Sequence, residues 1–195
     1  MGLDSIELVM EIEKYFAIQI PDAEAEKIFT IQLMVESVSN HLGISNSSTE
    51  LQKNIFNRIL SSLPASKTSF ENIDLNSLAS KYLSPHDKEA WNYFKVNLGL
   101  EVPAPDFPNH NSSKFIDKLK RWVNWVPNYD WYSLTMEQFT NSICAANYLS
   151  LIDKNNIRSI FEVYVAVVGI TVDKIGVDYY EVLPEKSFTT DLGVD

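Results

Sequence analysis

The spacing of apolar residues near the start of the chain is the feature that most constrains its fold. Apolar side chains recur there every three or four residues, which is the spacing of one face of an α-helix. The residues of this face are Leu3, Ile6, Val9, Met10, Ile12 and Phe16. A helix over 3–16 with so broad an apolar side is stable only when it packs against a second apolar surface. The rest of the chain must therefore supply that surface.

The same spacing, together with capping residues, predicts helices along the whole chain and hence an all-α fold. Asp22 is expected to cap a short turn through Ala23–Lys27, and Thr30 to cap a helix that Gly43 closes. The other expected helices are Leu51–Leu63, one that Ser84 caps and Gly99 ends, Lys114–Trp125, one that Thr135 caps, and a last one from Ile157 to Gly169. In the last helix the β-branched run VYVAVVGITV would also fit a strand.

Residues between these helices are interpreted as connections. SNSST at 45–49 has the composition of a flexible linker, and the proline-rich stretch 101–113 is predicted to be a loop. From Gly169 to the end of the chain, Pro184 and several glycines also indicate loop.

The net charge of −10 is concentrated at the two ends of the chain. Residues 1–44 have eight acidic residues against Lys14 and Lys27, and residues 157–195 have seven against three basic ones. Residues 45–156 have eleven of each sign. We expect the two ends to form one acidic unit that repels nucleic acid and attracts basic patches on proteins. The alternative is that these acids only keep the ends soluble.

Little in the sequence points to an enzyme, a metal site or a membrane. Cys144 is the single cysteine, so no internal disulfide forms, and we interpret it as a buried hydrophobe rather than a nucleophile paired with a histidine. His41, His86 and His110 are scattered, without the spacing of metal ligands. No segment has the apolar length of a membrane span, and the start lacks the basic region of a signal peptide. We therefore predict a cytoplasmic protein without a catalytic residue, a bound metal or a membrane partner.

Two parts of the chain resemble the acyl carrier protein family. Residues 2–42 resemble its second to fourth helices, through ELVM, the stretch I-P-D-A-E-A-E-K-I and the threonine-led helix that follows. Residues 157–195 resemble its first helix and long loop, ending in S-F-T-T-D-L-G-V-D. The family's order is inverted here, and the resemblance covers about 80 of the 195 residues.

The resemblance implies that the two chain ends, 1–44 and 157–195, build one four-helix bundle. Residues 45–156 would then be a linker and an additional helical domain of unassigned role. A circular permutation within one chain, exchange of the ends in a homodimer, and excision from a tandem array are the alternatives, and we favour the first. It follows that 157–168 should pack against 3–16 and that Asp195 should lie close to Gly2.

Members of this family carry an acyl group on 4′-phosphopantetheine, which is attached to the serine of a D-S-L motif at the start of the second helix. The N-terminus of a helix suits the phosphodiester, and the thioester chemistry belongs to the arm and to the partner enzymes. By local match to Leu3-Asp4-Ser5-Ile6, Ser5 would be the attachment residue. The partners implied are a phosphopantetheinyl transferase and the acyl-transferring or synthase enzymes of fatty acid or polyketide biosynthesis.

An alignment of ELVM and the I-P-D turn without gaps gives a different register. Gly2 then falls on the serine position, Leu3 on the leucine of D-S-L, and Ser5 lies one turn inside the helix. In that register the unit would be a carrier-like interaction module without its prosthetic group. In both registers an acidic helix would meet basic patches on partner enzymes. Its acidic residues are Asp4, Glu7, Glu11 and Glu13.

The neutral middle segment is rich in aromatic residues. The stretch RWVNWVPNYDWY at 121–132 holds three of the four tryptophans, and Trp91 is the fourth. We expect these rings to form a satellite core between two helices, with a groove for an acyl chain or peptide as the alternative.

Overall fold

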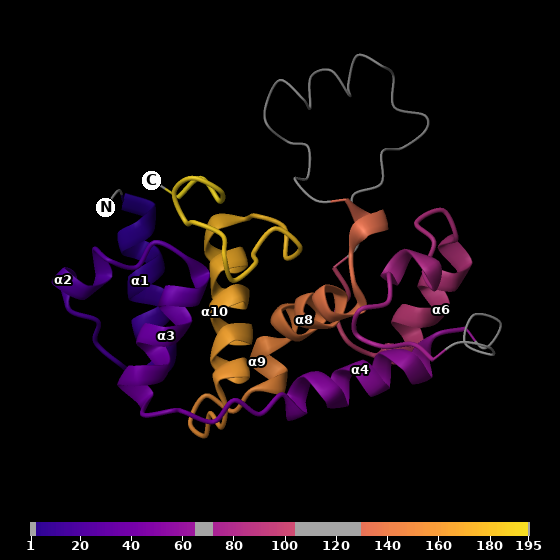
Figure 1. The fold of residues 1–195 in the computed structure, drawn as a ribbon, viewed down its shortest axis with the longest axis horizontal. Helices are drawn as coiled ribbons and strands as arrows, with labels where there is room; N and C mark the ends of the chain where they lie inside the picture. The colour runs from indigo at the N-terminus through magenta and orange to yellow at the C-terminus, as the bar shows by residue number, and fades with distance from the viewer. Residues whose placement is uncertain (1–2, 65–71, 104–129, 195) are drawn as a thin grey trace, which may run out of the picture.

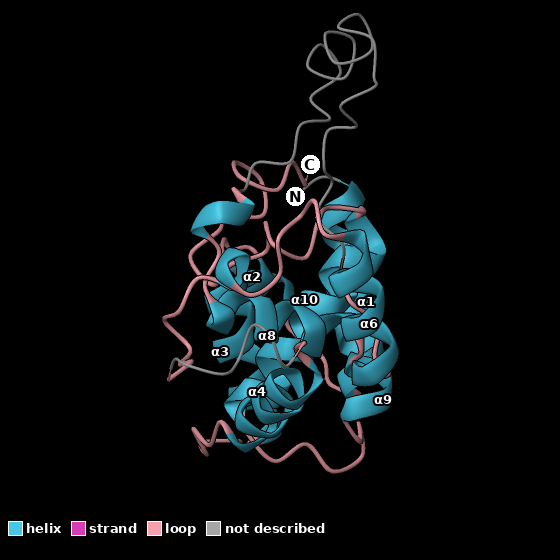
Figure 2. Ribbon diagram, turned by 90° about the vertical axis from the view of Figure 1, so that its right-hand side faces the viewer, coloured by secondary structure: helices cyan, strands magenta, loops and turns pink. Residues whose placement is uncertain are grey.

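The computed structural model describes residues 3–64, 72–103 and 130–194. These residues form helices and loops, without a named strand in the described ranges (Figures 1 and 2), so the predicted all-α class is confirmed. The α-helices are α1 (Leu3–Phe16), α2 (Asp22–Ala25), α3 (Ile31–Leu42), α4 (Glu50–Ser62), α6 (Lys88–Leu98), α8 (Met136–Ala146), α9 (Tyr148–Leu151) and α10 (Ile160–Ile175). Two 3₁₀ turns are η1 (Ala79–Lys81) and η2 (Trp131–Ser133). The predicted helix over 114–125, most of the 101–113 loop, and Gly2, His110 and Asp195 lie outside the described residues.

The capping residues predicted several helix boundaries correctly. The Thr30 hydroxyl accepts a hydrogen bond from the amide of Leu33 (3.3 Å), and Gly43 closes α3 with φ +67°. At the start of α8, Thr135 and Gln138 exchange hydrogen bonds in a capping box.

Two predicted caps were wrong. Asp22 is the first residue of α2 and does not cap it, because Pro21 occupies the preceding position. Asp87, rather than Ser84, caps α6 by accepting a hydrogen bond from the amide of Ala90 (3.0 Å). The helix therefore begins several residues later than Ser84 predicted.

The buried face of α1 differs in part from the predicted one. Leu8, Ile12 and Phe16 are buried one turn apart, whereas Ile6 and Met10 are 44% and 59% exposed. Helix α1 thus has a buried apolar face and, on its opposite side, a second apolar stripe that faces solvent. Leu8 was not among the predicted face residues because apolar residues surround most of this helix.

The last helix is longer than predicted. Helix α10 does not stop at Gly169 but continues to Ile175, where Gly176 closes it with φ +78°. Gly169 is instead the residue at which α10 closely approaches α8 and α9. A Cβ at this position would lie 2.8 Å from the carbonyl oxygen of Ala145 and closer still to the ring of Tyr148. The β-branched run that also fitted a strand is helical.

Helix α10 is the centre of the fold. It packs against α1 and α3 on one side and against α8, α9 and α4 on the other (Figure 1). Apart from half-buried Tyr164, each side chain from Glu162 to Thr171 is buried, as expected for a helix that is apolar almost all round. The predicted packing of 157–168 against 3–16 is confirmed by the contact of α10 with α1.

The two ends of the chain are hydrogen-bonded to each other. Their backbone hydrogen bonds are Ile31 N to Lys186 O (3.2 Å), Gln32 N to Pro184 O (2.8 Å) and Phe188 N to Phe29 O (3.0 Å). Phe188, Leu192 and Val194 are buried, so the C-terminal segment belongs to the core. The beginning of α1 and the end of this segment lie side by side in Figures 1 and 2.

The middle helices surround an aromatic core. The ring of Trp91 lies 5.3 Å from that of Trp131, and the ring of Trp131 lies 5.6 Å from that of Phe139. This core reaches the C-terminal loop, because the ring of Tyr180 lies 5.9 Å from Trp131 and its hydroxyl donates a hydrogen bond to Pro103 O (2.6 Å). Trp91 and Trp131 are thus core residues as predicted, but their core is continuous with that of the chain ends and is not a separate satellite. Trp122 and Trp125 lie outside the described residues.

The close approach at Gly169 can be tested by substitution. Because the Ala145 carbonyl cannot move freely, we expect Gly169→Ala to lower the free energy of unfolding by about 1–3 kcal/mol, despite the better helix propensity of alanine. Urea denaturation measures this change. In a Tyr148→Ala background the same substitution should cost less, since the nearest ring is gone. An equal cost in both backgrounds would contradict the contact.

Candidate functional site

The start of α1 contains the candidate attachment residue. Ser5 is the third residue of the helix and is half-buried, while Asp4 beside it is exposed. The first backbone N–H groups of a helix lack helical partners and carry the positive end of its dipole. An anionic group attached in this turn would therefore be favoured electrostatically. Gly2, the residue of the alternative register, lies outside the described residues.

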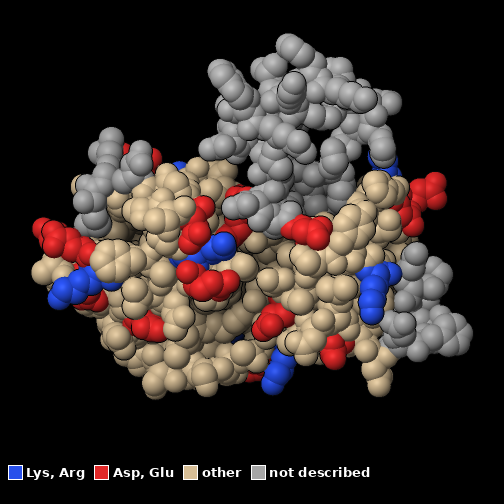
Figure 3. All heavy atoms as spheres, turned by 45° about the horizontal axis from the view of Figure 1, so that its top comes forward, with Lys and Arg blue, Asp and Glu red and all other residues tan. Residues whose placement is uncertain are grey.

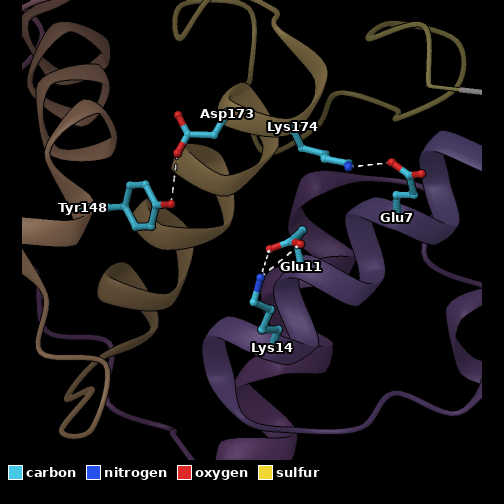
Figure 4. Close-up of polar contacts among 6 residues, drawn as sticks. All are labelled: Glu7, Glu11, Lys14, Tyr148, Asp173 and Lys174. Atoms are coloured by element: carbon cyan, nitrogen blue, oxygen red, sulfur yellow. Dashed lines mark hydrogen bonds and ion pairs between the residues drawn. The ribbon is translucent and has the colours of Figure 1, made fainter.

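The acidic residues expected to meet partners have different surroundings (Figure 4). Glu7 Oε2 forms an ion pair with Lys174 Nζ of α10 (2.5 Å), and Glu11 forms one with Lys14 on the same helix (3.2 Å). Glu13 Oε1 accepts a hydrogen bond from the backbone amide of Ile20 (2.6 Å) and thereby holds the loop that follows α1. The side chains of Glu7 and Glu11 are each 45% exposed, so both carboxylates remain accessible.

The exposed apolar stripe of α1 lies next to these carboxylates. Ile6 and Met10 are one turn apart and exposed, and Glu7 and Glu11 follow them directly in sequence on the solvent side of the helix. Acidic side chains predominate on the face of the molecule seen in Figure 3. An apolar stripe bordered by carboxylates fits a partner surface that combines apolar and basic residues.

Lys174 is a residue of this site that the sequence analysis missed. It lies in the last turn of α10, which had been expected to end at Gly169. The side-chain hydrogen bond to Glu7, with the charges of Glu7, Glu11 and Asp4, raises the pKa of Lys174. The helical spacing of apolar residues continues through Val172 and Ile175, and this is the sequence signal that could have placed Lys174 on the helix.

The other titratable residues are engaged in structural contacts. Tyr148 donates a hydrogen bond to Asp173 (3.0 Å), and burial raises the pKa of its phenol. Burial also raises the pKa of the Cys144 thiol to about 12, so the thiol stays protonated. His86 Nε2 lies 3.5 Å from the hydroxyl of Tyr132. Within the described ranges, no group of three His, Cys, Asp or Glu side chains is arranged to hold a metal ion.

A second cluster joins α2 to α3. The hydroxyl of Ser37 donates a hydrogen bond to Glu24 Oε1 (2.5 Å), and His41 Nε2 lies 3.1 Å from Glu24 Oε2. Because the carboxylate lies between the serine and the histidine, His41 is hydrogen-bonded to Glu24 and not to the serine, so this is not the serine–histidine pair of an activated nucleophile. The cluster fixes the short helix α2 against α3.

No model of a known protein family matches the sequence. No solved structure matches the fold. A search of the described helices also finds none with the length and apolar composition needed to cross a bilayer. The function of the site must therefore be inferred from its own residues.

The Glu24 cluster predicts a pH dependence of stability. The hydrogen bond from Ser37 and the neighbouring His41 lower the pKa of Glu24 below its ordinary value of 4.5. A carboxyl whose pKa is lower in the folded state stabilises that state above the unfolded pKa and loses this effect as pH falls through the folded pKa. We expect Glu24→Gln to lower the melting temperature at pH 6 and to have less effect near pH 3.

Thermal denaturation of both proteins across this pH range measures the Glu24 effect. Glu26→Gln removes an exposed carboxylate two residues away and controls for the loss of one negative charge. A difference between Glu24→Gln and the wild type that stays constant with pH would contradict the assigned contacts.

The burial of Cys144 predicts an unreactive thiol. At pH 8 the folded protein should react with a thiol reagent at least about a hundredfold more slowly than the same protein in denaturant, because the thiol is both inaccessible and protonated. Since the chain has a single cysteine, the labelled fraction can be read directly from the intact mass. Rapid labelling of the folded protein would contradict this assignment.

Proposed function

We propose that this protein is an acyl-carrier-like protein that carries an acyl group on 4′-phosphopantetheine at Ser5 and docks partner enzymes through α1. The observation that supports it most is the union of the two chain ends, whose backbones are hydrogen-bonded between 29–32 and 184–188. These are the two segments that separately resemble parts of one carrier bundle. Helix α10 of the same chain also packs against α1 and α3, which favours a circular permutation over exchange between two chains.

The chemistry of carriage fits the start of α1. Ser5 lies in the first turn, where the positive end of the helix dipole favours a phosphodiester. A carrier requires no catalytic residues, since the reactive thiol belongs to the arm and the bond-making groups belong to partner enzymes.

The docking face consists of the exposed side of α1, which we define by Asp4, Ile6, Glu7, Met10 and Glu11. Glu7 and Glu11 are exposed enough to contact lysine or arginine residues of a partner, and the exposed side chains of Ile6 and Met10 offer apolar contacts between them. The partners that fit are a phosphopantetheinyl transferase and acyl-transferring or synthase enzymes with basic patches. Electrostatic attraction of this kind mainly raises association rates and selects partners.

A second candidate function is docking without the prosthetic group. Ser5 is the third residue of α1 and half-buried, so it is only partly open to a modifying enzyme. If Gly2 takes the place of the family's serine, the docking face would still attract basic partners. The two functions differ only in whether an arm is attached.

Intact mass after incubation with coenzyme A and a broad-specificity phosphopantetheinyl transferase separates the two functions. We expect the wild-type protein to gain the mass of one phosphopantetheine. Ser5→Ala should gain none, because the attacking hydroxyl is absent. Ser61→Ala, which removes an exposed hydroxyl from α4, should be modified like the wild type.

Two results would overturn carriage at Ser5. One is unmodified wild-type protein that circular dichroism shows to be folded, which would favour the docking module without an arm. The other is equal modification of wild type and Ser5→Ala, which would place the arm on a different residue.

A further inference from the structure

The ion pair between Glu7 and Lys174 places a cation of this chain on the docking face. Lys174 extends from the last turn of α10 across to the second turn of α1 (Figure 4), where its ammonium lies 2.5 Å from Glu7 Oε2. Its neighbour Asp173 is held on the other side of α10 by the hydroxyl of Tyr148. The last turn of the central helix is thus fixed on both sides, and it presents Lys174 to α1.

The position of Lys174 coincides with the position that a basic partner would occupy. The acidic residues of the docking face act on it together, since Glu7, Glu11 and Asp4 all favour its charged form. A lysine or arginine of a partner that approached Glu7 would meet the same carboxylate oxygen. Two ammonium groups on one carboxylate repel each other, so a partner cation binds Glu7 more strongly once Lys174 has moved away.

The pair is also exposed enough to be exchanged. The side chain of Lys174 is 32% exposed and that of Glu7 is 45% exposed. Ion pairs in contact with solvent are weak, because water screens them and both side chains lose freedom when they form. A partner can therefore replace the pair without unfolding any part of α1 or α10.

We propose that Lys174 is an intramolecular competitor for Glu7, and that a basic partner docks on α1 by displacing it. Lys174 then lowers the affinity of α1 for basic surfaces of partners. Surfaces with too little positive charge to displace Lys174 do not bind. This inference rests on the proposed docking function and assigns to Lys174 a role in partner selection.

The test uses a synthetic amphipathic helical peptide of leucine and lysine as the probe, with a scrambled peptide of the same composition as its control. Affinity for the 195-residue chain is measured by isothermal titration calorimetry at low salt. We expect Lys174→Gln to bind the amphipathic peptide about twofold to fivefold more tightly than the wild type, because Glu7 then lacks its ion pair with Lys174.

The matched control is Lys186→Gln, which changes the net charge equally. Lys186 lies in the C-terminal segment, where its ammonium is 3.9 Å from Asp191. A gain caused only by net charge would appear equally in both variants. Competition for Glu7 predicts a gain larger in Lys174→Gln, and a larger loss of affinity on Glu7→Gln when Lys174 is already replaced.

The outcomes separate this inference from the proposed function. A greater gain in Lys174→Gln than in Lys186→Gln, with the expected coupling to Glu7→Gln, supports the competitor role. Equal affinities of the two lysine variants would overturn it while leaving docking intact. If neither the wild type nor any folded variant prefers the amphipathic peptide to the scrambled one, the docking face itself is wrong, and the competitor role is overturned with it.

Discussion

The rest of the structure depends on the burial of α10. This helix is apolar almost all round, so it is stable only when neighbours cover it on several sides. Helices α1 and α3 cover one side, and α8, α9 and α4 cover the other. Neither the chain ends nor the middle segment alone encloses α10, which makes the two parts energetically dependent on each other. Gly169 permits a close approach of α9 by leaving room for the Tyr148 ring.

The fold could be predicted from the sequence where local chemistry decides it. Thr30, Gly43 and Thr135 satisfy backbone groups at helix ends, so their signals are readable without knowledge of the tertiary structure. Gly169 misled the prediction because a glycine that ends a helix and one that admits a neighbouring ring look identical in sequence. The exposure of Ile6 and Met10 likewise depends on which side of α1 meets α10, and periodicity alone does not decide that for a helix with apolar residues on several sides.

The candidate site shows the same division between local and long-range information. The acidic character of α1 follows from its composition, and all four of the expected acidic residues lie on this helix: Asp4, Glu7, Glu11 and Glu13. Their individual roles depend on contacts across the fold. Glu13 holds the backbone of Ile20, and Glu7 meets a lysine more than 160 positions later in the chain. Composition therefore predicted the acidic surface of α1, but it did not predict which of the carboxylates already have partners within the protein.

The place of α10 in the chain has a physical consequence for the candidate site. Because α10 follows the middle segment and also contacts α1 and α3, one helix packs against two parts of the chain at once. The side of α10 that contacts Tyr148 packs against the middle helices, and the side that carries Lys174 packs against α1. A change in how α8 and α9 pack on α10 would therefore alter the position of its last turn. Under the competition that we propose for Lys174, that position sets how much of the acidic charge on α1 is available to a partner, and the packing of α8 and α9 then influences docking.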